Sequence, residues 1–228
     1  MPASSVFQSH TINSSPTNLS ISNPNIFLEP GAEIRNSYVS DGLYMERYSG
    51  LSRTTTVGPC GIGSFSYVSD SIVSAYCHVG PRTSVGGFEH PFSSLSQSSF
   101  FWGQNIKFWH DASTGHIDPA NLRPVEKTTI LEPDVWVGAN CVVKSGLQLA
   151  TGSIIGAGSI LTKSTEPYGI YVGNPAVLLK FRFTEDVISS LLGSEWWKLP
   201  FSFLYKLNLS DLHGSLERIY AFKSTNPT

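Results

Sequence analysis

Residues 129–163 read TILEPD, VWVGAN, CVVKSG, LQLATG, SIIGAG and SILTK when the sequence is divided every six residues. The third residue of each unit is aliphatic, and the first is mostly small. The third positions are Leu131, Val137, Val143, Leu149, Ile155 and Leu161. Because a unit that buries one aliphatic side chain cannot form a core alone, such units must stack into a solenoid. The period predicts short flat strands that meet at tight corners, and it disfavours an antiparallel sandwich, whose strands alternate every two residues.

A less regular copy of this pattern lies upstream. Its aliphatic residues are Leu28, Ile34, Ile62, Val68, Val73, Val79 and Val85. They are spaced by six except for gaps and for one residue that is skipped before Val73. We therefore expect the solenoid to begin before Leu28 and to run, with interruptions, to about Lys163.

The repeat stops between Gly87 and Thr128, in an insert rich in aromatic residues. These aromatic residues are Phe88, Phe92, Phe100, Phe101, Trp102, Phe108 and Trp109. Long interruptions of a regular fold are usually functional loops. Exposed aromatic side chains are a liability in water, so we expect them to pack on a neighbouring wall or subunit and to line a pocket.

The C-terminal part changes from the period of six to helical spacing. Thr184 precedes two acidic residues and an apolar stripe, which predicts a helix start. We expect a second short helix around Leu204 to Leu209 and a third at Leu212 to Tyr220, together capping the open end of the solenoid. The predicted domains are an N-terminal segment over 1–25, a β-helix over 26–166 with a loop insert at 87–128, and a helical extension over 167–228.

Composition excludes several classes of protein. Charged residues make up 14% of the 228 residues and the net charge is −2, so neither disorder nor a general attraction for nucleic acid is expected. Cys60, Cys77 and Cys141 lack the paired spacing of zinc sites, and their odd number argues against a disulfide framework. No stretch has the length of a membrane span or the pattern of a leader. We predict a cytoplasmic protein without a metal.

Six motifs occur in one order along the chain: Asp134–Asn140, Ile155–Ser159, Thr162–Lys163, Gly173–Ala176, Arg182–Phe183 and Trp196–Pro200. As a set they resemble the hexapeptide-repeat acyltransferases, in the xenobiotic acetyltransferase branch that also includes saccharide O-acetyltransferases. The resemblance covers about residues 62–200. It implies a left-handed parallel β-helix, a homotrimer, and acetyl-CoA as co-substrate in the cleft between two subunits.

A histidine is the expected catalytic group. Direct acyl transfer needs a general base with a pKa near neutrality beside the nucleophile. His90 lies where the repeat breaks into the insert, and it matches the catalytic histidine of the family. Trp136 matches a family tryptophan that packs near that imidazole, although it could equally be an outward aromatic covered by the next subunit. We expect ordinary structural or surface roles for the other histidines: His10, His78, His110, His116 and His213.

The cofactor residues are also implied by the resemblance. Small residues at the corners let the pantetheine arm approach the backbone, and these are Gly138, Ala139, Ala157 and Gly158. Thr162 and Lys163 lie towards the nucleotide, and Pro175 shapes the wall of the tunnel. We expect Lys163, Lys180 and Arg182 to cluster near the end of the solenoid and to pair with phosphates.

The predicted function is transfer of acetyl from acetyl-CoA to a saccharide hydroxyl, on a surface polysaccharide or its precursor. One alternative is N-acetylation of an amino-sugar nucleotide, and another is O-acetylation of an antibiotic such as chloramphenicol or a streptogramin. A non-catalytic solenoid that binds a partner through its flat faces is the alternative from a different class.

Overall fold

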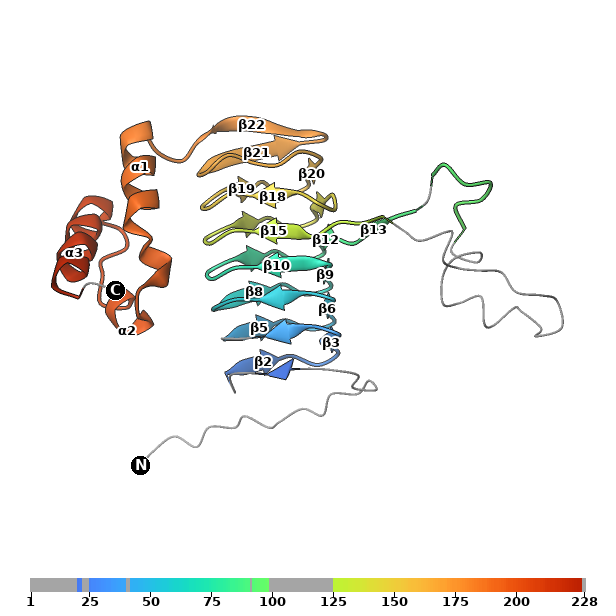
Figure 1. Cartoon of the computed structure of the whole chain (residues 1–228), viewed down its shortest axis with the longest axis horizontal. Coiled ribbons are helices and arrows are strands. Elements are labelled where there is room, and N and C mark those ends of the chain that lie inside the picture. Colours follow the sequence, from blue (N-terminus) through green and yellow to red (C-terminus); the bar gives the residue numbers. More distant parts are fainter. Residues whose placement is uncertain (1–19, 22–24, 40–41, 91, 99–124, 227–228) are drawn as a thin grey trace, which may run out of the picture.

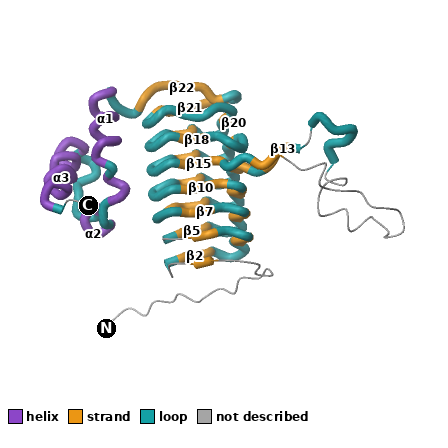
Figure 2. The backbone as a smooth tube through the Cα atoms, viewed as in Figure 1, coloured by secondary structure: helices purple, strands orange, loops and turns teal. Residues whose placement is uncertain are grey.

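The computed structural model of the chain describes residues 20–21, 25–39, 42–90, 92–98 and 125–226. These residues form a stack of short strands with helices beside it (Figure 1). Apart from a small antiparallel pair in the insert, the strands belong to three sheets, which we call faces A, B and C; these are parallel except for the last strand at the upper end, and the chain visits them in that order in successive coils. Figure 2 shows that each coil consists of short strands joined by turns.

Each face is a sheet whose strands come from successive coils. Face A contains β1 (Ser20–Ile21), β4 (Tyr38–Val39), β7 (Thr55–Thr56), β10 (Ser71–Val73), β15 (Thr129–Leu131) and β18 (Gln148–Leu149). Face B contains β2 (Ile26–Leu28), β5 (Leu43–Met45), β8 (Cys60–Ile62), β11 (His78–Val79), β16 (Trp136–Val137), β19 (Ile154–Ile155), β21 (Gly169–Gly173) and β22 (Ala176–Phe181). Face C contains β3 (Glu33–Arg35), β6 (Gly50–Ser52), β9 (Tyr67–Ser69), β12 (Ser84–Gly86), β17 (Val142–Val143) and β20 (Ile160–Leu161).

The aliphatic repeat positions form the core, which confirms the predicted parallel β-solenoid. All six of the downstream positions that define the repeat are at most 1% exposed: Leu131, Val137, Val143, Leu149, Ile155 and Leu161. Each stacks on its equivalent in the next coil; Val137, for example, pairs in register with Val79 below and Ile155 above. The column of close-packed side chains is the main source of stability, since each strand is only a few residues long.

The upstream strands pair from coil to coil in one continuous stack, so the irregular spacing expected there does not interrupt the solenoid before the insert. Leu51 pairs with Val68, 17 residues later, whereas Leu131 pairs with Leu149, 18 residues later. The upstream coils are shorter by one residue at the corner from face C to face A, which we call the C/A corner. A single-residue deletion at one corner shifts the phase of the pattern without disturbing the stack, so a search at period six loses it.

The insert leaves the solenoid at the C/A corner. Gly86 and Gly87 have φ of 71° and 96°, and a Cβ on Gly86 would lie 2.1 Å from the carbonyl oxygen of Ser69. Two strands then form an antiparallel stem, β13 (Phe88–Glu89) and β14 (Val125–Glu126), which projects from the stack (Figure 1). Five of the seven insert aromatics lie outside the described residues: Phe100, Phe101, Trp102, Phe108 and Trp109.

The upper end of the solenoid is closed by strands and not by the helices, so the predicted capping role is wrong. Strand β22 folds back antiparallel onto β21 and lies over the last coil (Figure 1). The helices α1 (Glu185–Ser194), α2 (Phe201–Leu204) and α3 (Leu212–Thr225), with the 3-10 turn η3 (Trp196–Lys198), stand beside the coils. Their apolar side chains reach Tyr76 and Tyr168, at the corner between faces A and B, which we call the A/B corner.

The first and third helices agree with the sequence prediction, but the second is shifted. Thr184 precedes α1, and Asp211 caps α3 by accepting a hydrogen bond from the Gly214 N–H at 3.0 Å. Pro200 precedes α2, so this helix starts at Phe201. It ends at Leu204, which is where the second helix was predicted to begin. Among the described residues, no helix has the length and apolar character needed to span a bilayer.

Candidate acyl-transfer site

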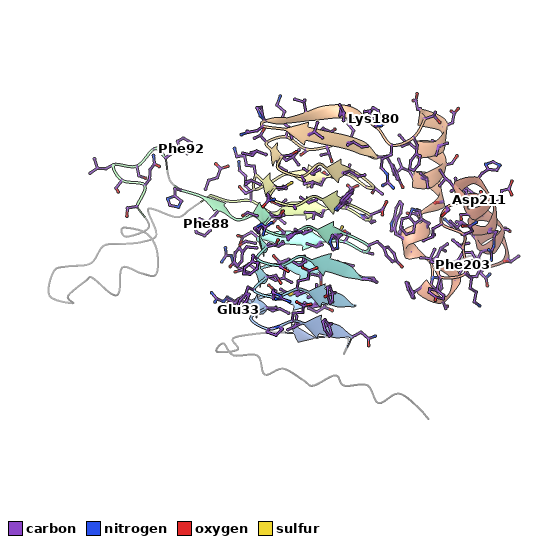
Figure 3. All side chains as sticks on the ribbon, turned by 180° about the vertical axis from the view of Figure 1, so that it is seen from behind. Glu33, Phe88, Phe92, Lys180, Phe203 and Asp211 are labelled. Carbon is purple, nitrogen blue, oxygen red and sulfur yellow. The ribbon has the colours of Figure 1, made fainter. Side chains whose placement is uncertain are left out.

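His90 lies just beyond the stem of the insert. Figure 3 shows its neighbours Phe88 and Phe92 on the segment that projects away from the helices. The Phe88 ring lies 6.2 Å from the imidazole and nearly parallel to it. Glu89 points elsewhere and forms an ion pair with Lys144, with Oε1 3.0 Å from Nζ. The ion pair of Glu89 with Lys144 therefore anchors the insert stem to the solenoid, and the Phe88 ring packs beside the imidazole of His90.

The imidazole of His90 has a defined tautomer. Its Nδ1 lies 2.7 Å from the carbonyl oxygen of Gln97. Because a carbonyl oxygen can only accept, Nδ1 must carry the proton and donate it to this bond. The neutral ring then bears its lone pair on Nε2. A histidine with an oriented ring and an unprotonated Nε2 is suited to take a proton from a hydroxyl.

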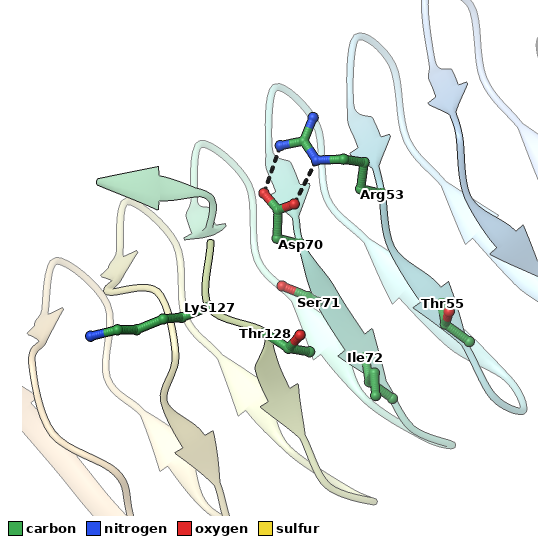
Figure 4. A pocket seen from close by; sticks show the side chains of 7 residues that line it. All are labelled: Arg53, Thr55, Asp70, Ser71, Ile72, Lys127 and Thr128. Carbon is green, nitrogen blue, oxygen red and sulfur yellow. Dashed lines mark hydrogen bonds and ion pairs between the residues drawn. The ribbon is translucent and has the colours of Figure 1, made fainter. Parts of the chain in front are cut away.

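A polar groove of about 440 Å³ lies at the C/A corner beneath the insert (Figure 4). Arg53 and Asp70 come from successive coils and form a two-point ion pair, with Nη2 2.7 Å from Oδ2. Lys127 and Thr128, where the chain returns from the insert, form the opposite rim. The groove lies beside the stem that carries His90, so it can hold polar parts of a substrate near that side chain.

Trp136 lies on the other side of the solenoid. It points outward from face B, is 51% exposed, and pairs in register with His78 below and Ile154 above. Face B is opposite the C/A corner in the three-sided coil, and the stem of the insert projects away from the solenoid. The chain therefore does not bring its own His90 to its own Trp136.

The small residues predicted to contact the cofactor lie together at the corner from face B to face C, the B/C corner. Ala157 and Gly158 are exposed there, and Pro175 stands in the turn above them. The Gly138 N–H donates to the Ile155 carbonyl at 2.7 Å and the Gly158 N–H donates to the Ala139 carbonyl at 2.8 Å. The N–H groups of these two glycines thus form hydrogen bonds between neighbouring coils. No hydrogen bond among the described residues engages the N–H of Ala139 or Ala157, so these are the groups that can meet a ligand.

Gly138 has a second role, which is to let the coils approach. A Cβ on Gly138 would lie 2.7 Å from the backbone nitrogen of Ala157. The B/C corner is therefore a stack of backbone with little side chain, open to an extended ligand.

The three cations do not cluster, so that prediction is corrected. Lys163 follows β20 and lies at the C/A corner, and Arg182 follows β22 and pairs with Asp134 at the A/B corner. Lys180 lies near the same end of β22, on the side of the helices (Figure 3). Arg182 is also committed to the protein. Its Nη1 donates to Asp134 Oδ2 at 2.9 Å and to the Gly152 carbonyl at 2.8 Å, and its guanidinium lies 5.2 Å from the ring centres of Tyr168 and Phe183.

This ion pair fixes the start of the helical region to the A/B corner. Burial raises the pKa of Asp134, and the hydrogen bond and charge of Arg182 oppose that rise. An apolar cavity of about 810 Å³ between this corner and the helices contains no histidine in its lining. The pair therefore joins the helices to the solenoid and does not face His90.

The buried thiols do not supply a nucleophile. Burial raises the pKa of Cys60 to about 12 and also raises the pKa values of Cys77 and Cys141. A thiolate is the reactive form of cysteine, so these three groups are unreactive near neutral pH. Among the described residues, no group of three or more His, Cys, Asp or Glu side chains is placed to hold a metal ion.

The chain is similar in sequence to known acetyltransferases. A chloramphenicol acetyltransferase from Klebsiella aerogenes is 30% identical over 194 residues, covering 79% of this chain and 89% of the relative. The chain belongs to the xenobiotic acetyltransferase branch of the hexapeptide-repeat acyltransferases. A probable macrolide acetyltransferase from Lysinibacillus sphaericus is 45% identical, over 32% of this chain and 41% of that protein.

Among solved structures, this acetyltransferase is similar in fold to AntD, an N-acyltransferase from Bacillus cereus crystallised with dTDP and 3-hydroxybutyryl-CoA. The TM-score is 0.58 at 19% identity, and the match covers 79% of this chain and 89% of AntD. No family model matches the sequence.

Sequence reasoning missed two features of this acetyltransferase. The Arg182–Asp134 pair joins residues 48 apart, and no sequence pattern marked them as partners. His78 was expected to have an ordinary structural role, but it lies directly beside Trp136 on face B. The signal was present in the sequence, because Val79 and Val137 are both repeat positions and the residue before each must point outward.

Proposed function

We propose that the protein transfers acetyl from acetyl-CoA directly to a hydroxyl of a saccharide, with His90 as general base. The observation that carries this proposal is the hydrogen bond from His90 Nδ1 to the Gln97 carbonyl, which leaves the lone pair on Nε2. The buried thiols favour direct transfer over a cysteine acyl-enzyme.

In the reaction, Nε2 of His90 accepts the hydroxyl proton while the hydroxyl oxygen attacks the acetyl carbonyl. The tetrahedral intermediate is stabilised by a backbone N–H, and its collapse breaks the C–S bond. The imidazolium then returns its proton to the CoA thiolate. The products are the acetyl ester and CoA, and the enzyme regains its starting protonation state.

We further propose that the site lies between two copies in a homotrimer. His90 and Trp136 are both exposed and lie on opposite sides of one solenoid. An insert that projects away from its own solenoid can reach face B of a neighbour, and cyclic symmetry repeats this contact at each interface. The groove at Arg53 and Asp70 would then form the wall opposite Trp136.

Acetyl-CoA would lie along the B/C corner of the copy that supplies Trp136. The N–H groups of Ala139 and Ala157 would bind pantetheine amides, and Pro175 would close one side. Gly138 and Gly158 would keep the backbone open there. Thr162, Lys163 and Lys180 are exposed near the last coil and would meet the nucleotide from different corners, whereas Arg182 would act indirectly by holding the helical region.

Chloramphenicol is the second candidate acceptor. A relative that covers 79% of this chain at 30% identity is a chloramphenicol acetyltransferase, and this similarity supports that compound as an acceptor. Both candidates are hydroxyl compounds and require the same chemistry at His90.

Release of thiol from acetyl-CoA tests the proposal. The purified protein would be incubated with acetyl-CoA and, in separate reactions, with neutral oligosaccharides, amino-sugar nucleotides, chloramphenicol or a streptogramin. We expect release that depends on a saccharide and forms its acetyl ester by mass. Release only with chloramphenicol would replace the acceptor, and N-acetylation of the amino sugar would replace the reaction. Absence of both release and acetyl-CoA binding would favour a binding solenoid.

A further inference from the structure

His78 belongs to an outward column of residues on face B. Successive coils place one residue of this column at each level, in register. From the base upward, these residues are Phe27, Tyr44, Gly61, His78, Trp136 and Ile154. Four of them carry rings, and the first two are stacked with centroids 5.1 Å apart. Gly61 is the one position in this column without a side chain.

The imidazole of His78 occupies the space that Gly61 leaves. A Cβ on Gly61 would lie 2.7 Å from His78 Nδ1 and 3.3 Å from Cε1. The ring therefore leans down over the glycine, on the side away from Trp136. The orientation of the imidazole is set by Gly61, which leaves space below it, and by the strand that carries Trp136 above it.

Packing alone holds this ring, although its surface is exposed. No hydrogen bond or ion pair in the described part of the chain involves the His78 side chain. Neighbouring polar groups do have partners: the Tyr44 hydroxyl donates to Glu29 at 2.8 Å, and Glu46 accepts from the Ser64 N–H at 2.9 Å. An exposed imidazole beside Trp136 thus has hydrogen-bonding capacity that the protein does not use.

Glu46 is a charged group that interacts electrostatically with His78. Hydrogen bonds from Ser64 lower the pKa of Glu46, and the charge of His78 lowers it further. Arg47 acts on Glu46 in the same direction. Glu46 is therefore a carboxylate near neutral pH, and in the column the imidazole lies between Gly61 below and Trp136 above.

We propose that His78 binds the acceptor through a hydroxyl other than the one that is acetylated. This inference rests on the proposed function, because it takes Trp136 as a wall of the acyl-transfer cleft. Neighbouring strands lie about 4.8 Å apart, so an acceptor ring on Trp136 has its next substituents at the level of His78. The acceptor is then a compound with at least two nearby hydroxyls, as in a sugar ring or a propanediol.

Three variants separate recognition from packing. His78→Phe keeps a ring over Gly61 and removes both nitrogens, whereas His78→Gln keeps a hydrogen-bonding group. Gly61→Ala retains the imidazole but pushes it from its position, since the added Cβ meets only the movable ring. The probes are methyl glucoside and chloramphenicol, each compared with an analogue that lacks one of the hydroxyls not acetylated.

For the intact acceptor we expect His78→Phe to raise the acceptor KM by about 3–10-fold, the value of one hydrogen bond. The KM for acetyl-CoA and kcat should stay within about twofold. Gly61→Ala should raise the same KM, but it should have no further effect in a His78→Phe background. His78→Gln should recover part of the loss, and the deoxy analogue should be insensitive to every variant.

Two results would overturn the inference while leaving the proposed function intact: an unchanged acceptor KM in His78→Phe, or an equal loss with the intact and deoxy acceptors. If the wild-type protein transfers acetyl to neither probe class nor to any other hydroxyl acceptor in the panel, the proposed function fails and this inference fails with it.

Discussion

Replacing His90 with alanine is expected to lower kcat by about 10²–10⁴-fold, the usual contribution of a general base. The imidazole is positioned by Gln97 and lies on the insert, so its removal leaves the stacked core untouched. The affinity for acetyl-CoA should change little, because the proposed contacts of the cofactor lie at the B/C corner. Steady-state thiol release and a direct acetyl-CoA binding measurement together check both statements.

His213→Ala is the matched control for this variant. His213 lies on α3, its side chain is 89% exposed, and its Nε2 lies 3.3 Å from Glu217 Oε1 on the same helix. We expect its turnover to equal that of the wild type. If His90→Ala retained wild-type kcat, the assignment of His90 as general base would be wrong. If His90→Ala lost both turnover and acetyl-CoA binding, the residue would be supporting the binding cleft.

Ile155→Ala should destabilise the protein by about 2–5 kcal/mol, the usual cost of emptying a buried aliphatic position. Ile155 is 0% exposed and stacks between Val137 below and Tyr171 above. Each coil contacts only its neighbours, so a cavity in one coil weakens both adjacent interfaces. Chemical denaturation followed by circular dichroism measures the change in the free energy of unfolding.

Ile154→Ala is the control because the same residue type is truncated on the same strand, but the Ile154 side chain points away from the core. Ile154 is adjacent in the chain and points outward from the same strand of face B. We expect a loss below about 1 kcal/mol there. Equal losses at the two positions would mean that the inward and outward positions are assigned wrongly.

The downstream half of the fold could be predicted because its six-residue spacing is unbroken from Leu131 to Leu161. The upstream half could be predicted only in part. There the C/A corner is one residue shorter, and Thr56 takes a core position that the aliphatic pattern requires to be Val, Ile or Leu. A search for a constant period misses both changes, although the stack itself is continuous.

The position of the helices could not be predicted from their amphipathic pattern. That pattern shows that Leu191 and Leu216 are buried, but it does not show what covers them. The choice between the solenoid end and its side is made by long-range contacts: Tyr76 with Trp196 and Arg182 with Asp134. Pairings of this kind depend on the three-dimensional arrangement and leave no periodic signal.

For the candidate site, the residue types could be predicted and their grouping could not. The break in the repeat located His90, and the corner glycines located the backbone stack. The expected group of cations failed because residues 163, 180 and 182 are close in sequence yet separated by the triangular course of the chain. In a solenoid, each change of face turns the side chain towards a different side of the molecule.

Mixing two inactive variants tests the central claim, that His90 of one copy serves Trp136 of another. His90→Ala and Trp136→Arg would be co-expressed with different tags, and assemblies carrying both tags would be isolated. Every mixed cyclic trimer, whichever variant supplies two copies, has about one third of its sites with an intact His90 and an intact Trp136 from different copies. We therefore predict that the isolated mixed assemblies recover up to about one third of wild-type acetyl transfer, from two variants that are each inactive alone. Mixed assemblies as inactive as their parents would contradict a site shared between copies.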